Sequence, residues 1–80
     1  MKDYQNIALR FARKHGYDTV RPAGQRDGYR YFHYFSEATI GRKTGWPKFV
    51  KVSEYGKPSP VENLSERMWA LKQEVSLNDP

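Results

Sequence analysis

The segment GYRYFHYF, residues 28–35, carries five aromatic rings and one histidine within eight residues. Aromatic side chains favour β-strands, and successive residues of a strand point to opposite faces of the sheet. Rings therefore lie on both faces of any strand that forms over residues 29–35. One of these faces belongs to a core, and the other face is a candidate surface for a function.

The segment over residues 3–15 is predicted to be a helix. Ile7 and Phe11 belong to an apolar face at helical spacing. Asp3 is a suitable N-cap residue. Gly16 follows the last turn, and helices commonly end at a glycine whose backbone adopts the left-handed conformation.

Three strands are predicted after this helix, over residues 17–21, 29–35 and 48–54. The first two are separated by turn residues, of which the pair Asp27-Gly28 is the strongest signal. A loop with two glycines and a proline, residues 36–47, leads into the third strand.

The last element is predicted to be a helix over residues 60–75. Ser59, Pro60 and Glu62 form a capping box with proline at the first helical position. An apolar stripe then follows at spacings of three and four residues: Val61, Leu64, Met68, Leu71 and Val75. Residues 76–80 are expected to be a frayed tail.

The order helix-strand-strand-strand-helix favours an α+β fold in a single domain over residues 1–80. Short connections between consecutive strands indicate a three-stranded antiparallel sheet. Two amphipathic helices need an apolar sheet face to cover, so we expect a two-layer sandwich with both helices on one face.

In that arrangement the other sheet face meets solvent or a partner. Burial of Arg30 without a partner is costly, so we assign Tyr29, Tyr31 and Phe35 to the helix-covered face. Val50 and Val52 are expected on that face too. The residues expected on the open face are aromatic or basic: Arg30, Phe32, Tyr34, Phe49 and Lys51.

The open face has two interpretations. Rings interleaved with cations are typical of platforms on which single-stranded nucleic acid stacks. Alternatively, these rings pack on one another across strands and are shielded by the aliphatic stems of lysine and arginine.

Positive charge is the second candidate feature. The net charge is +5, and residues 1–57 hold twelve Lys and Arg against five Asp and Glu, whereas residues 58–80 hold two against four. Five cations on the predicted first helix and the loop form a candidate basic surface: Arg10, Arg13, Lys14, Arg42 and Lys43. Such side chains neutralise phosphates without reading sequence, or they form an ordinary solvated surface.

Trp69 is the third candidate feature, because it lies away from the apolar stripe of the last helix. An indole in that place either covers the edge of the core or anchors a protein interface, where tryptophan is enriched.

Composition excludes several functions. The chain has no cysteine, which excludes disulfides, thiolate metal sites and a cysteine nucleophile. His15 and His33 lack metal-ligand spacing, and nothing supplies a nucleophile beside them. We expect no enzyme activity, no cofactor and no metal. We also expect a soluble, cytoplasmic protein, since no apolar run approaches the roughly 20 residues of a membrane span.

The predicted element order is similar to that of double-stranded RNA-binding domains. That family places a lysine-rich cluster at the start of its last helix, whereas the charges here are Glu62, Glu66 and Arg67. Its Gly-Pro turn with a histidine is also missing between the first two strands. Fold order alone does not carry function, so no family is assigned.

Two functions therefore remain open. The first is nucleic-acid binding through the basic helix face and the aromatic-basic sheet face. The second is protein interaction or self-association through the exposed aromatic sheet face or Trp69.

Overall fold

The computed structural model describes residues 3–36 and 48–78. These residues form six elements: α1 (Tyr4–Lys14), β1 (Thr19–Arg26), β2 (Tyr29–Phe35), β3 (Lys48–Ser53), β4 (Pro58–Pro60) and α2 (Leu64–Asn78). The strands make one antiparallel sheet in the order β1-β2-β3-β4. The α+β class with two helices and an antiparallel sheet is confirmed, but the sheet has four strands rather than three.

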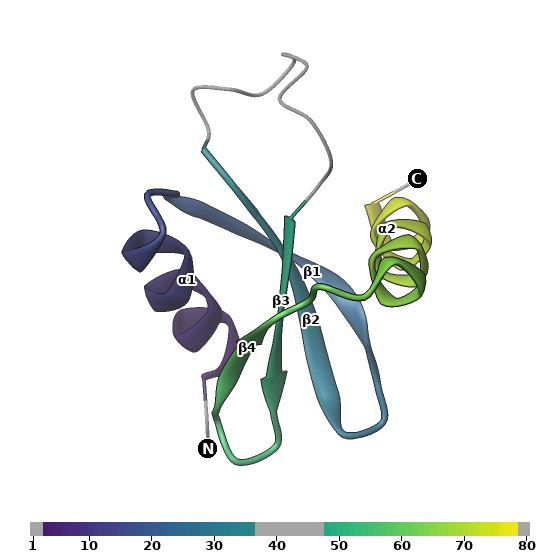
Figure 1. Cartoon of the computed structure of the whole chain (residues 1–80), viewed down its shortest axis with the longest axis horizontal. Helices are drawn as coiled ribbons and strands as arrows, with labels where there is room; N and C mark the ends of the chain where they lie inside the picture. Colours follow the sequence, from purple (N-terminus) through teal and green to yellow (C-terminus); the bar gives the residue numbers. More distant parts are fainter. Residues whose placement is uncertain (1–2, 37–47, 79–80) are drawn as a thin grey trace.

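The two helices cover opposite faces of the sheet, with the strands between them (Figure 1). Ala8 and Ala12 of α1 pack on one face, against a cluster that includes Phe32 and Val50. On the other face, Ala70 of α2 belongs to a second cluster with other apolar side chains: Ala23, Tyr31, Phe49 and Val61. The expected two-layer sandwich with both helices on one face is therefore wrong. The physical reason is that β2 and β3 carry large apolar side chains on both faces, and each face needs a cover.

Helix α1 forms as the sequence predicts. The Asp3 carboxylate accepts a hydrogen bond of 3.0 Å from the backbone N–H of Asn6. After the helix, Gly16 adopts a φ of +87°, and the N–H of Tyr17 donates to the carbonyl of Ala12 at 2.9 Å. Both ends of α1 are therefore capped by local contacts.

The β1–β2 hairpin has a two-residue turn at Asp27 and Gly28, whose φ angles are +53° and +81°. This turn is the one predicted. Strand β1 is longer than predicted, because it continues past Pro22 to Arg26. The register of the β1–β2 pairing shifts between Pro22 and Gln25, as in a β-bulge. Within this irregularity Gly24 has a φ of +101°.

The predicted helix start at Pro60 is wrong. Pro58–Pro60 instead forms β4, which pairs with β3, and the N–H of Val61 donates to the carbonyl of Phe49 at 3.0 Å. The helix begins at Leu64, where the Asn63 side chain accepts from the backbone N–H of Glu66 at 3.2 Å. Pairing with the sheet therefore overrides the local capping signal. The helix also extends to Asn78, beyond its predicted end.

Helix α2 turns three residues of the apolar stripe away from the sheet, whereas Leu71 packs against the core and Val61 is buried before the helix begins. Leu64, Met68 and Val75 are 58%, 52% and 58% exposed. The residues that face the sheet are Glu66, Trp69, Ala70, Gln73 and Glu74. The expectation that this stripe covers the sheet is therefore wrong for Leu64, Met68 and Val75, and holds for Val61 and Leu71. In the described part of the chain, neither helix is long and apolar enough to cross a bilayer.

Candidate functional site

The aromatic residues predicted for an open sheet face are buried. Phe32 and Tyr34 lie under α1, and Phe49 lies under α2 with 2% of its surface exposed. The expected open platform of rings is therefore wrong, since both faces are covered. The assignment of Val50 to the same face as Tyr31 is also wrong, because Val50 pairs directly with Phe32.

The two cations predicted for that face lie on opposite sides of the sheet. Arg30 is exposed and its guanidinium stacks 4.5 Å from the ring centre of Tyr4 in α1. Lys51 lies on the α2 side, where its Nζ donates to Glu66 at 3.2 Å. Because Arg30 and Lys51 lie on opposite sides of the sheet, they do not form one surface. Each of them also has a partner within the chain.

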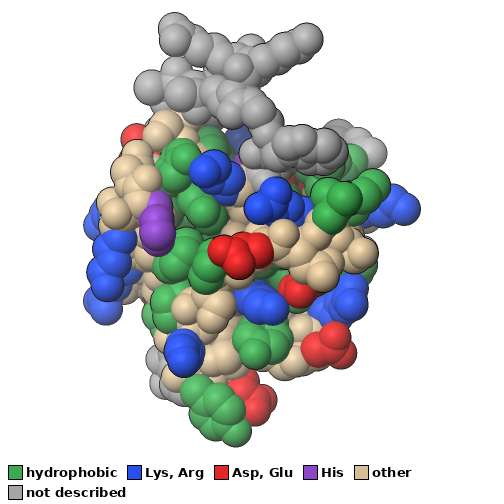
Figure 2. Space-filling view, in the orientation of Figure 1, with side chains coloured by type: hydrophobic (Ala, Val, Ile, Leu, Met, Phe, Trp, Pro, Cys, Tyr) green, Lys and Arg blue, Asp and Glu red, His purple; other side chains and the backbone are tan. Residues whose placement is uncertain are grey.

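The basic face of α1 is present in the structure. Arg10, Arg13 and Lys14 are exposed on the side of the helix opposite the buried Ala8 and Ala12. Residues three and four apart on a helix are surface neighbours, so the three cations are adjacent. Lys and Arg side chains gather over α1 at the left of Figure 2. Arg42 and Lys43, predicted to join them, lie outside the described residues.

Two further cations stack on aromatic rings near the two ends of α1. Arg30 covers Tyr4 at the start of the helix. Beyond its end, the Nζ of Lys48 lies 5.8 Å from the ring centre of Tyr17. Stacking on a ring holds a cation in place with its charge still exposed to solvent. We refer to Arg10, Arg13 and Lys14 together with these two stacked residues as the basic side of the molecule.

A polar cluster connects α2 to the sheet. The hydroxyl of Tyr31 donates to Oε2 of Glu66 at 2.8 Å, and Lys51 donates to the same oxygen. Burial, followed by this hydrogen bond, raises the pKa of Tyr31 to about 12. The bond from Tyr31 lowers the pKa of Glu66, and Lys51 adds to that effect. The cluster therefore favours a neutral tyrosine beside an ionised glutamate.

A second polar contact lies further along α2. The Nδ1 atom of His33 is 2.9 Å from Oε1 of Glu74, whose side chain is almost fully buried. The ring of His33 also packs against Phe35 and Phe49. These contacts connect α2 to the sheet. His33 does not line the depression described below.

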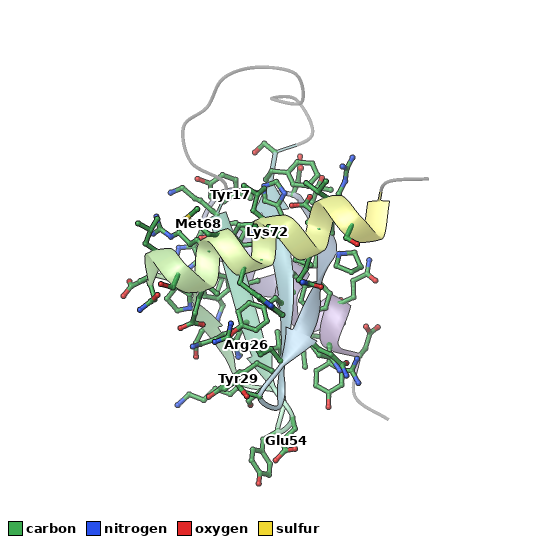
Figure 3. The ribbon with its side chains drawn as sticks, turned by 90° about the vertical axis from the view of Figure 1, so that its right-hand side faces the viewer. Tyr17, Arg26, Tyr29, Glu54, Met68 and Lys72 are labelled. Atoms are coloured by element: carbon green, nitrogen blue, oxygen red, sulfur yellow. The ribbon has the colours of Figure 1, made fainter. Side chains whose placement is uncertain are left out.

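Trp69 packs on the sheet rather than pointing into solvent. Its ring meets Tyr31 edge to face, with ring centres 4.9 Å apart. The guanidinium of Arg26 lies 5.3 Å from the indole centre. These contacts agree with the interpretation of Trp69 as a cover over the core edge. Figure 3 shows Arg26 beside the strands and Met68 and Lys72 on α2 in front of them.

A shallow depression with a volume of about 510 Å³ lies near the β1–β2 turn. Its lining residues combine both signs of charge with two tyrosines: Tyr4, Gln25, Arg26, Asp27, Gly28, Tyr29, Arg30 and Glu54. Arg26 already pairs with Asp27 at 3.2 Å. Within residues 3–36 and 48–78, no three His, Asp or Glu side chains group as metal ligands would. Neither feature provides a constellation for catalysis.

No protein-family model, no curated protein and no solved structure matches this chain. Two surfaces of the described residues are candidates for a function. One is the basic side. The other is the exposed stripe of α2, formed by Leu64, Met68, Leu71 and Val75, of which Leu71 is partly buried.

The exposure of Leu64, Met68 and Val75 does not follow from the sequence, because an apolar stripe on a helix ordinarily faces the nearest core. One signal was available on the opposite side of the helix. Ala70 and Gln73 lie there, and Gly24 of β1 comes within contact of Gln73. A Cβ atom at Gly24 would lie 3.1 Å from Cβ of Gln73, so the glycine allows this side of α2 to approach the strand closely.

Proposed function

We propose that the protein binds nucleic acid through phosphate contacts made by the basic side. The observation that carries this proposal is the unequal charge of the two helices. Helix α1 holds Arg10, Arg13 and Lys14 and no acidic residue. In α2, by contrast, the two acidic side chains of Glu66 and Glu74 balance Arg67 and Lys72.

The geometry of α1 suits a phosphate backbone. Its cations project from a helix whose opposite side is fixed on the sheet through Ala8 and Ala12. The guanidinium groups of Arg10 and Arg13 offer paired N–H donors, the arrangement that matches phosphate oxygens. These contacts position a nucleic acid without reading its bases.

Base stacking is not part of the proposal. The rings of Phe32, Tyr34 and Phe49 are buried, so a strand of unpaired bases has no sheet surface on which to stack. We therefore expect binding that is indifferent to sequence and at least as strong for a duplex as for a single strand, because the duplex has the higher charge density.

The test is fluorescence anisotropy with a labelled 20-base-pair duplex. The variant Arg10→Gln/Arg13→Gln/Lys14→Gln removes three charges from the basic side. A matched control, Arg21→Gln/Lys57→Gln/Lys72→Gln, removes three exposed charges elsewhere. Engagement of three phosphates predicts that raising the salt from 50 to 200 mM weakens wild-type binding about 40-fold.

We expect the basic-side variant to bind at least tenfold more weakly than wild type and to lose most of its salt dependence. The control is expected to change by less than threefold. Equal losses in the two variants would show that only net charge matters. Absence of wild-type binding at tens of micromolar protein in 50 mM salt would reject nucleic acid as the partner.

A second candidate function is protein association through α2. The observation that favours it is the exposure of Leu64, Met68 and Val75 on one helix. A row of apolar side chains in water is typical of an interaction surface. This surface lies across the sheet from the basic side, so the two functions do not compete for residues.

A further inference from the structure

The depression near the β1–β2 turn lies where three separate parts of the chain meet. Gln25 and Arg30 line it from paired positions of β1 and β2, Tyr4 lines it from the start of α1, and Glu54 from the connection between β3 and β4. Both hairpin turns and the start of α1 lie at the same end of the molecule (Figure 1). The volume of about 510 Å³ falls within the roughly 300–1,000 Å³ that is usual for small-ligand pockets.

The walls of this depression are held in place by contacts within the chain. The hydroxyl of Tyr4 donates to the backbone carbonyl of Glu54 at 3.2 Å, which ties α1 to the β3–β4 connection. The guanidinium of Arg30 lies 4.5 Å from the ring centre of Tyr4. The Nζ of Lys51 lies 4.9 Å from the ring centre of Tyr29. A ligand that enters therefore meets side chains that are already positioned, so that little conformational entropy is lost on binding.

The positive charge of the depression is concentrated at Arg30. Arg26 also lines the depression, but its Nε is 3.2 Å from a carboxylate oxygen of Asp27, which compensates its charge. Arg30 contacts the neutral ring of Tyr4 instead. The N–H groups of a guanidinium lie in its plane, so contact with a ring leaves them able to donate to two oxygens of one phosphate. The depression therefore offers a place for a single phosphate group.

The rest of the lining suits the planar base that a nucleotide carries. The rings of Tyr4 and Tyr29 offer contact to a base, and the amide of Gln25 both donates to and accepts from a base edge. Gln25 pairs with Arg30 across the strands, so the amide and the guanidinium project from neighbouring positions on one face of the hairpin. We infer that the depression binds a nucleotide with one phosphate, free in solution or unpaired within a strand, with Arg30 on the phosphate and Gln25 on the base.

Arg30 also belongs to the basic side, which connects the depression to α1. Arg10 comes six residues after Tyr4 in this helix, which is about 9 Å along the helix axis. A few nucleotides span that distance, since phosphates follow one another at about 3.4 Å along each strand of a duplex. In its strand-bound form the inference rests on the proposed function, whereas binding of a free nucleotide does not.

The first experiment follows the backbone amides of the full chain by nuclear magnetic resonance during titration with adenosine 5′-monophosphate. We expect a dissociation constant on the order of 0.1–1 mM, because the depression is shallow. The largest shifts are expected at residues 25–30 and at Glu54. Adenosine and inorganic phosphate, titrated separately, are expected to bind at least tenfold more weakly, since each of them engages only part of the site.

Two variants separate recognition by the depression from attraction by charge. Arg30→Gln removes the phosphate contact and is expected to weaken binding of adenosine 5′-monophosphate at least tenfold. Its control, Arg21→Gln, removes another exposed arginine, which lies 5.2 Å from the ring centre of Phe35 and outside the depression, and is expected to weaken binding less than twofold. Gln25→Ala leaves the charge unchanged and is expected to weaken binding at least threefold. The dispersion of the amide spectrum shows whether each variant is folded.

The second experiment distinguishes the two sources of the nucleotide. Fluorescence anisotropy compares a blunt 20-base-pair duplex with the same duplex carrying three unpaired nucleotides at one end. If the depression takes a nucleotide of a strand, the overhang tightens binding at least threefold for wild type and much less for Gln25→Ala. Equal affinities for the two duplexes, together with shifts at residues 25–30 on addition of adenosine 5′-monophosphate, assign the site to a free nucleotide.

Two results would overturn the inference. One is equal binding of adenosine 5′-monophosphate and inorganic phosphate, which would show attraction by charge alone. The other is the absence of shifts at about 10 mM nucleotide together with equal affinities for the two duplexes. The proposed function is tested separately, by the blunt duplex and by the variant at Arg10, Arg13 and Lys14, which do not line the depression. If the blunt duplex does not bind, the titration with the free nucleotide alone decides the inference.

Discussion

The two faces of the sheet hold their helices by different means. On the α1 face, Ala8 and Ala12 have no exposed surface and pack on Val50 and Val52, which are equally buried. On the α2 face, the apolar contact is smaller and carboxylates take part in it. Glu66 accepts from Tyr31, and Glu74 lies within hydrogen-bond distance of His33.

This difference shows that one sheet can use two sources of stability. Burial of apolar surface is insensitive to pH, whereas hydrogen bonds to a carboxylate are lost when the carboxylate is protonated. We therefore expect α1 to be the more firmly held helix at every pH, and α2 to depend on the ionisation of Glu66.

The largest effect is expected from the variant Phe32→Ala on the α1 face. Removing a buried phenylalanine costs about 3–5 kcal/mol, and a chain of 80 residues has a total stability of about 4–12 kcal/mol. Urea denaturation followed by circular dichroism should show a chain that is barely folded. The control Leu64→Ala, at an exposed position, should cost less than about 0.5 kcal/mol. Similar losses in both variants would contradict the placement of the two helices.

The next effect concerns the close approach of β1 to α2. A Cβ atom at Gly24 would lie 3.1 Å from Cβ of Gln73, and the φ of +101° is unfavourable for other residues. Gly24→Ala is expected to cost about 1–3 kcal/mol. The control Gly28→Ala has a similar φ of +81° but nothing within 4 Å of its Cβ. The difference between the two free energies of unfolding measures the contact with α2, and equal values would mean that α2 does not approach β1 as described.

The smallest effect is expected from Glu66→Gln, which breaks the polar cluster. The variant should lose about 1–2 kcal/mol at neutral pH, since it removes hydrogen bonds to a charged acceptor. The folded state lowers the pKa of Glu66 below its ordinary value of 4.5. This group therefore adds stability above that value and loses its contribution as pH falls through the lowered pKa.

The measurement for this variant is the free energy of unfolding between pH 7 and pH 3. Wild type should lose more stability over this range than Glu66→Gln. The control Glu62→Gln changes an exposed carboxylate before α2, and its profile should follow wild type. A parallel decline in Glu66→Gln and wild type would exclude Glu66 as a source of acid sensitivity.

Local signals in the sequence predicted the first half of the fold well. The cap at Asp3, the end at Gly16 and the turn at Asp27-Gly28 depend on residues close together in the chain, and the structure contains all three. Helix α1 and strand β2 follow from them. Such features need no knowledge of distant partners.

Long-range pairing explains where the sequence reasoning was wrong. The capping box at Ser59 was overridden because that residue pairs with Lys51 of β3. The charge of Arg30 predicts that its face of β2 is exposed, but Arg30 is the second residue of the strand and its guanidinium reaches the ring of Tyr4. Phe32, two residues further along the same face, is buried under α1. One charged residue at a strand end does not determine the environment of the whole face.

The candidate site was only partly predictable for the same reason. The cations of α1 were found because the helical period alone places Arg10, Arg13 and Lys14 opposite the apolar side. The stripe on α2 was found as a pattern, but its direction depends on which side of the helix approaches Gly24. Periodicity contains no information on that choice.

The two edge strands of the sheet, β1 and β4, affect whether strands of other copies can pair with it. An edge strand with unpaired N–H groups acts as a template on which further strands add without limit. Here β4 is three residues long with proline at both ends, and β1 is interrupted by Pro22 and the irregularity at Gly24. Proline has no N–H to donate. Both edges of the sheet therefore discourage open-ended strand addition between copies of the chain.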